Sequence, residues 1–94
     1  MMFLDCEFRW SHAKNLILQS ERNLAFEDVV TAIEDGRLLA DVQHPGRGRE
    51  HQRILIVEIG EFVCSVPYVR EGDVMFLKTV YRNSKFQRMY QRTP

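Results

Sequence analysis

Two adjacent segments in the first third of the chain carry their hydrophobic residues at helical spacing. In His12–Glu21, the apolar residues Ala13, Leu16 and Ile17 lie three and four positions apart, and Ser11 in front of them is a favoured N-cap residue. This segment is therefore predicted to be a helix.

The second segment repeats apolar residues at i, i+3, i+4 and i+7, namely Phe26, Val29, Val30 and Ile33. Glu27 and Asp28 fall in its first turn, where the helix dipole favours acids, and Gly36 is placed to end the helix. Because only a few residues join the two helices, they are expected to form an antiparallel or steeply crossed pair with one combined apolar surface.

Beyond Leu38 the hydrophobic period changes to two, which is the period of a β-strand. Four segments fit it: Leu38–Val42, Gln52–Ile59, Phe62–Val69 and Val74–Tyr81. Turn residues separate neighbouring segments, so an antiparallel meander of three consecutive hairpins is expected. Pro67 has no backbone N–H and predicts a bulge or a loss of pairing in its strand. A short helix with Asn83 as its N-cap is expected between Asn83 and Arg92.

Helices and strands occur in separate runs along the chain, which is typical of α+β folds. The two N-terminal helices are expected to pack on one face of a four-stranded antiparallel sheet, leaving the other face for a functional site. Residues 1–94 are predicted to form a single domain, since half of the chain would fall below the roughly 50 residues that one core needs.

The composition excludes several classes of protein. No stretch approaches the roughly 20 consecutive apolar residues that cross a bilayer, and Asp5 and Glu7 stand where a secretory signal needs a basic segment. A cytoplasmic protein without membrane contact is expected. Cys6 and Cys64 are far apart in sequence and predict free thiols, with Cys64 packing as a small hydrophobic residue. The histidines lack zinc-ligand spacing, so neither a metal nor a cofactor is expected.

Charge is distributed unevenly along the chain. Thirteen basic and thirteen acidic residues give a formal net charge of zero, which at face value argues against a nucleic-acid partner. Residues 1–36 have a net charge of −4, however, whereas residues 76–94 carry five bases and no acid. The five bases are Lys78, Arg82, Lys85, Arg88 and Arg92. Such a local field attracts phosphate even when the whole molecule is neutral, although basic residues near a chain end also solvate a surface or cap helices.

Strand alternation is expected to put Lys78 and Arg82 on one face of the sheet, with Val80 between them. Aromatic residues are interleaved with the bases, and Phe76 and Phe86 among them are expected in the core. A second basic group lies in and beside the loop after the first predicted strand: Arg47, Arg49 and Arg53.

Two runs near the N-terminus have a distinctive residue order. Residues 8–15 read Phe-Arg-Trp-Ser-His-Ala-Lys-Asn, and residues 24–30 read Leu-Ala-Phe-Glu-Asp-Val-Val. This order resembles the opening of BrnT-like toxins, where an aromatic-x-Trp-Asp-x-x-Lys-Asn stretch precedes a Ser/Ala-Phe-Glu-(Asp/Glu)-Ala/Val helix. Residues 56–59, 66–69 and 76–81 are similar to a branch of the same family. The resemblance therefore extends from Phe8 to about Tyr90.

BrnT-like proteins belong to the RelE-type toxin superfamily. The resemblance implies helices on a four-stranded antiparallel sheet and a bacterial type II toxin: an endoribonuclease paired with an antitoxin, expected to be of ribbon-helix-helix type. RelE-type toxins cleave RNA without a metal, by attack of the substrate's own 2′-OH on the adjacent phosphate, and build the site from Lys, Arg, Tyr and sometimes His. The resemblance and the acid-free segment together imply catalytic roles for Lys78, Arg82, Lys85 and Tyr90. Arg53, Arg88 and Arg92 are expected to bind RNA.

Two positions depart from the family pattern. Ser11 stands where the family has Asp, and it retains the N-cap function. Ser84 stands where the family commonly has Arg, whereas Lys85 is retained and Arg82 lies nearby. The alternative is therefore a catalytically weakened protein of the toxin fold that acts as a binding module for an antitoxin or another protein. Contact with DNA is expected only through a toxin–antitoxin complex, since no recognition-helix pattern is present.

Overall fold

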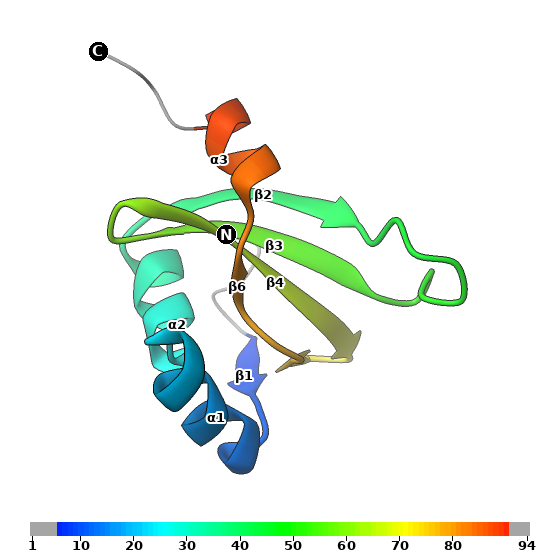
Figure 1. Cartoon of the computed structure of the whole chain (residues 1–94). Coiled ribbons are helices and arrows are strands. Elements are labelled where there is room, and N and C mark those ends of the chain that lie inside the picture. Colours follow the sequence, from blue (N-terminus) through cyan, green and yellow to red (C-terminus); the bar gives the residue numbers. More distant parts are fainter. Residues whose placement is uncertain (1–5, 91–94) are drawn as a thin grey trace.

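The computed structural model describes residues 6–90, in which two helices, a mixed sheet and a third, short helix form three layers (Figure 1). The elements in chain order are β1 (Glu7–Arg9), α1 (His12–Arg22), α2 (Phe26–Glu34), β2 (Leu38–Gln43), β3 (Arg53–Ile59), β4 (Phe62–Glu71), β5 (Val74–Leu77), β6 (Tyr81–Arg82) and α3 (Ser84–Tyr90). This is the predicted α+β order of two N-terminal helices, a mostly antiparallel sheet and a short C-terminal helix. No helix within residues 6–90 is long and apolar enough to cross a membrane.

The sheet has the strand order β1-β5-β4-β3-β2, and the predicted antiparallel meander is confirmed in β2 to β5. The sequence did not predict β1, which pairs in parallel with β5 and places Glu7 opposite Val74. The Glu7 N–H donates to the Asp73 carbonyl over 2.7 Å. A strand of three residues is too short to show a period of two, and this one depends on its neighbour for its conformation.

The predicted strand Val74–Tyr81 is wrong as a continuous element. β5 ends at Leu77, and Tyr81–Arg82 pair separately with β4 as β6. Residues 78–80 between them lie outside the ladder, although the Lys78 N–H donates to the Pro67 carbonyl over 2.8 Å.

Pro67 explains this interruption. Its pairing with Ile54 of β3 continues the β3–β4 register without a shift, so the predicted bulge does not form there. The nitrogen and carbonyl of a strand residue point to the same side, and the Pro67 carbonyl points to the side of Lys78. The position without an N–H therefore lies on the side of β4 that faces β5 and β6. Pairing is lost on that side alone, where β5 has ended and β6 has not begun.

The two N-terminal helices cover one face of the sheet and enclose the larger core (Figure 1). This core includes Phe26 and Val29 of α2, and Leu55 and Val66 of the central strands. Cys64 packs in it as predicted and is fully buried. Burial raises the pKa of its thiol to about 11, so Cys64 remains protonated at neutral pH.

Asn15 joins α1 to α2 within this layer. Its side-chain carbonyl accepts from the Phe26 N–H at the start of α2 over 2.8 Å, and its amide donates to Glu27 over 2.8 Å. The N-cap of α2 is Ala25, which has no side-chain acceptor of its own, so the buried Asn15 caps α2 from the neighbouring helix. Ser11 caps α1 as predicted, accepting from the Lys14 N–H over 3.1 Å.

The opposite face of the sheet carries a smaller apolar cluster of Ile54, Ile56 and Val63. α3 packs on it through Phe86 and Tyr90, which corrects the expectation that this face is open (Figure 1). Asn83 caps α3 as predicted: its side-chain carbonyl accepts from the backbone N–H groups of residues 85 and 86. Its side-chain amide donates to Ser65 over 3.0 Å, which fixes the start of α3 to β4.

Candidate nucleic-acid interface

Lys78 and Arg82 lie on opposite faces of the sheet, contrary to the prediction from strand alternation. Phe76, beneath Lys78, pairs with Val69 of β4, whereas Arg82 pairs with Cys64. Val69 and Cys64 are an odd number of residues apart in one strand and therefore face opposite sides. The prediction fails because strand geometry ends at Leu77 and the chain turns before β6 begins.

Both cations lie over exposed aromatic rings. The Lys78 ammonium is 5.3 Å from the centre of the Phe76 ring, and the Arg82 guanidinium carbon is 3.8 Å from the centre of the Phe62 ring. Phe76 is 37% exposed and Phe62 42%, so Phe76 is not the core residue that the sequence predicted. Each contact holds a cation at the surface without neutralising its charge.

The third layer adds two further cations. Lys85 and Arg88 of α3 are exposed, whereas Tyr90 turns inward and lies half-buried on the smaller apolar cluster. The Tyr90 ring is 6.0 Å from that of Phe86. Arg92 lies outside the described residues, as does Asp5.

None of the four cations between residues 76 and 90 forms an ion pair within the described part of the chain. They are Lys78, Arg82, Lys85 and Arg88. Their charges are therefore available to a ligand, in contrast to those of arginines elsewhere in residues 6–90 that pair with nearby carboxylates.

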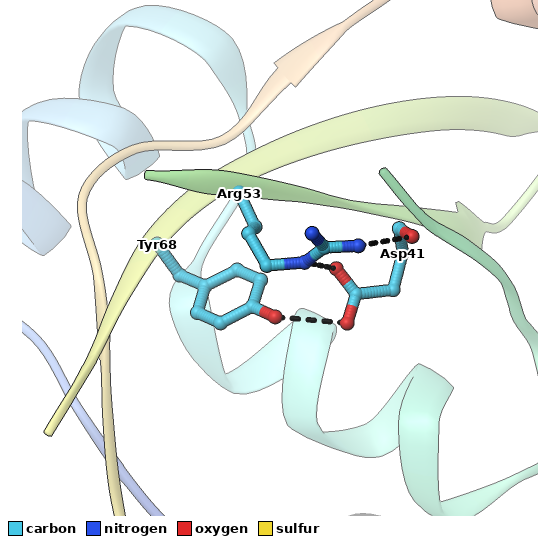
Figure 2. A network of polar contacts seen from close by, with 3 residues as sticks. All are labelled: Asp41, Arg53 and Tyr68. Carbon is cyan, nitrogen blue, oxygen red and sulfur yellow. Dashed lines mark hydrogen bonds and ion pairs between the residues drawn. The ribbon is translucent and has the colours of Figure 1, made fainter. Parts of the chain in front are cut away.

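Arg53 is such a paired arginine (Figure 2). Its Nε donates to Asp41 Oδ1 over 3.0 Å, and its Nη2 donates to the Asp41 backbone carbonyl over 2.9 Å. Tyr68 donates its hydroxyl proton to the other carboxylate oxygen, Oδ2, over 2.8 Å. The three residues come from β2, β3 and β4, so the network ties together neighbouring strands of the sheet.

The network raises the pKa values of Tyr68 and Arg53. Burial, reinforced by the hydrogen bond to Asp41, raises the pKa of Tyr68 to about 12, and the hydrogen bond to Asp41 raises the pKa of Arg53. The Arg53 guanidinium is already bound to Asp41, so it is less available to bind RNA than an unpaired arginine. Sequence reasoning missed Asp41 and Tyr68 because their proximity depends on the register of three strands.

An open cleft of about 780 Å³ lies between the end of α1 and β6. Its lining residues are Ser20, Glu21, Arg22, Asn23, Leu24, Tyr81 and Arg82. Arg22 Nη1 donates to the Val80 carbonyl over 2.8 Å and to Thr79 Oγ1 over 3.3 Å, which ties α1 to the interruption between β5 and β6. The segments that line the cleft are almost 60 residues apart in sequence, so no local sequence pattern predicts it.

Within residues 6–90, no group of three or more His, Cys, Asp or Glu side chains lies together in a way that would hold a metal ion. His44 has a local role instead: its Nδ1 accepts from the Gly46 N–H over 3.0 Å in the loop after β2.

Comparison with known proteins gives similar solved structures, among them two of YafQ. No protein-family model matches the chain, and no curated protein matches it. YafQ from E. coli strain BL21(DE3) superposes with a TM-score of 0.48 at 10% sequence identity. A single-residue mutant of YafQ from E. coli gives a TM-score of 0.47 at 11% identity. In each comparison the matched region covers 86% of this chain and 97% of the other.

Proposed function

We propose that this chain is the toxin of a bacterial type II toxin–antitoxin module and cleaves cytoplasmic RNA by attack of a 2′-OH on the adjacent phosphate. One observation carries the proposal: residues 76–90 hold four exposed cations and no acid, and none of these cations is paired with a carboxylate. Unpaired cations grouped on one segment are what binding to a phosphate backbone requires.

The proposed chemistry uses these cations directly. Attack by the 2′-OH forms a 2′,3′-cyclic phosphate and breaks the bond from phosphorus to the 5′-oxygen, while the hydroxyl proton passes to a base and the leaving oxygen takes up a proton. The additional negative charge on the phosphate in the transition state is stabilised by ammonium or guanidinium groups without a metal. Lys78 and Arg82 flank the interruption between β5 and β6 from opposite faces, so an RNA strand crossing this edge of the sheet meets both. Lys85 follows in the first turn of α3, Arg88 binds the backbone further along, and Tyr90 acts from the end of that helix.

The proposed membership of the BrnT-like family is supported by residues that hold the helical layer together. Trp10 stacks on Phe26 with ring centres 5.5 Å apart, and Asn15 bonds to Phe26 and Glu27. These family-like residues account for the fold more than for the chemistry. The proposed partner is an antitoxin of ribbon-helix-helix type, with any DNA contact made by the toxin–antitoxin complex.

A second candidate function follows from Ser84. This residue begins α3 with an exposed side chain at the position where the family commonly has an arginine. A hydroxyl cannot supply the lost charge, so a protein with weakened catalysis that only binds its partner is the competing proposal.

Incubation of the purified protein with RNA in EDTA separates the two candidates. We expect cleavage, and we expect the triple variant Lys78→Ala, Arg82→Ala, Lys85→Ala to lose at least about two orders of magnitude in rate, since removing single stabilising donors has effects of this size. The matched control is Arg70→Ala, because Arg70 is an exposed arginine at the other end of β4.

Each other outcome has a definite reading. Undiminished cleavage by the triple variant would show that the site is elsewhere. If the wild type neither cleaves RNA nor slows growth when expressed alone, but binds the product of an adjacent gene, the binding-module function is correct.

A further inference from the structure

Apart from Arg82, the residues that line the cleft between the end of α1 and β6 have no part in the proposed cleavage chemistry. We propose that the cleft binds one nucleotide of single-stranded RNA, with the phosphate on Arg82 and the edge of the base on Glu21. The choice of RNA as the source of this nucleotide rests on the proposed function, whereas binding of the nucleotide itself is tested separately.

Arg82 is held ready for an anion. The contact with Phe62 fixes one face of its guanidinium, and no described residue accepts a hydrogen bond from it or pairs with its charge. Its N–H donors therefore face solvent and the cleft, in the planar arrangement that binds phosphate through two parallel hydrogen bonds.

The wall of the cleft opposite β6 is formed by the end of α1. Arg22 Nη1 donates to the Val80 carbonyl and to Thr79 Oγ1, so this arginine fixes the β6 side of the cleft relative to the helix. Glu21 beside it is exposed, and no described residue forms an ion pair with its carboxylate. The cleft thus presents a free guanidinium and a free carboxylate together.

This pairing of charges selects among ligands. Glu21 and the negative end of the α1 dipole would repel an acidic peptide or an inorganic phosphate. A nucleotide brings a phosphate for Arg82 and, on guanine or cytosine, N–H donors for a carboxylate. The face of the Arg82 guanidinium that Phe62 does not cover also offers a surface on which a base can stack. A volume of about 780 Å³ lies within the range of small-molecule sites and accommodates one nucleotide.

Titration of the isotopically labelled full chain with GMP, CMP, UMP, guanosine and inorganic phosphate, followed by amide NMR, tests the site. We expect GMP and CMP to shift the amides of residues 20–24 and 81–82 more than UMP, guanosine or phosphate does. Arg82→Ala should weaken GMP binding about tenfold or more, as for loss of a bidentate charged contact. Glu21→Gln should reduce the preference for GMP over UMP while retaining the phosphate contact.

The matched control is again Arg70→Ala, which should leave GMP affinity unchanged, and unshifted amides in α2 and β3 would verify that each variant is folded. Phosphate shifting the same amides as strongly as GMP would reduce the cleft to an anion site and overturn the proposal. A short polyglutamate peptide that shifts them where GMP does not would also overturn it, in favour of a protein ligand. RNA cleavage without GMP binding refutes the cleft alone, and GMP binding without RNA cleavage refutes the proposed function alone.

Discussion

At the scale of single residues, the side chains on which the family resemblance rests mainly connect neighbouring elements of the helical layer. Asn15 is buried and provides the acceptor that Ala25 lacks at the start of α2. It also donates to Glu27, and this hydrogen bond lowers the pKa of the Glu27 carboxyl. One asparagine therefore orders the helix start and keeps an acid charged beside it.

Replacement of Asn15 should destabilise the protein measurably. Asn15→Ala leaves the Phe26 N–H without a partner in a buried position, and the expected loss is about 2 kcal/mol of unfolding free energy. Urea denaturation measures it. Gln19→Ala, an exposed change on the same helix, should alter stability by less than about 0.5 kcal/mol. Equal losses in the two variants would contradict the capping role of Asn15.

Tyr68 gives a prediction about alkaline pH. Its folded pKa of about 12 lies above the ordinary tyrosine value of 10.0, so folding favours the protonated phenol. The resulting stabilisation is complete below pH 10 and is lost as the pH rises from about 10 to 12. Absorbance at the tyrosinate band should show one of the three tyrosines titrating late.

Two variants test this assignment. Tyr68→Phe should remove the late titration altogether, and Asp41→Ala should lower the pKa of Tyr68 only in part, since burial contributes more than the hydrogen bond. If the wild type shows no titration step that Tyr68→Phe removes, the network in Figure 2 does not hold the Tyr68 proton.

At the scale of elements, α3 depends on the sheet for its existence. Seven residues are too few to form a stable helix alone, so its conformation derives from the Asn83 cap, the contacts of Phe86 and Tyr90, and the bond that Gln87 accepts from the Val63 N–H over 2.6 Å. The position of Lys85 and Arg88 therefore depends on these few attachments of α3 to the sheet.

Asn83→Ala should release this layer. It removes two hydrogen bonds at the start of α3 and leaves the buried Ser65 hydroxyl without its donor, a loss of about 1 kcal/mol or more. Hydrogen exchange should show faster exchange in α3 than in β3. Ser84→Ala is the control, since that neighbouring side chain is exposed. Unchanged protection of α3 in the Asn83 variant would rule out the cap as its anchor.

The elements also show how much of the fold can be predicted from the sequence. Both N-terminal helices, the meander and the Asn83 cap were predicted from local periods and local residue types. The buried face of α1 was not, because Ala13, Leu16 and Ile17, whose spacing predicted this helix, are exposed, and its buried residues are Asn15 and Leu18. β1 and β6 were not, because strands of three and two residues have no period of their own. The Asp41–Arg53–Tyr68 network and the cleft depend on register and on contacts between distant segments. The same limit explains the error over Lys78 and Arg82, whose faces are set by the loss of pairing beside Pro67.

At the scale of the whole molecule, a net charge of zero conceals two differently charged surfaces. The helical layer contains most of the acids of residues 1–36, whereas residues 76–90 contain only cations. Under the proposed function, we expect an RNA strand to be attracted to residues 76–90 and repelled by the acidic surface of α2.

This polarity predicts a salt dependence of RNA binding. If Lys78, Arg82, Lys85 and Arg88 each contact one phosphate, the plot of log affinity against log salt should have a slope of about −3, since each phosphate contributes about −0.7 for a single strand. Fluorescence anisotropy with a labelled oligonucleotide measures the slope. Each single alanine variant should reduce its magnitude by about 0.7, and Arg70→Ala should not. A slope near zero would exclude backbone binding by these residues.

The stack of Trp10 on Phe26 has a practical consequence for such experiments. Trp10 is the sole tryptophan of the chain, so intrinsic fluorescence reports the helical layer. Events on α3, on the far side of the sheet, should leave its emission unchanged. Trp10 emission during denaturation and amide exchange in α3 therefore report independently on two different layers of the protein. Together they distinguish a ligand that frees the basic layer from one that unfolds the whole chain.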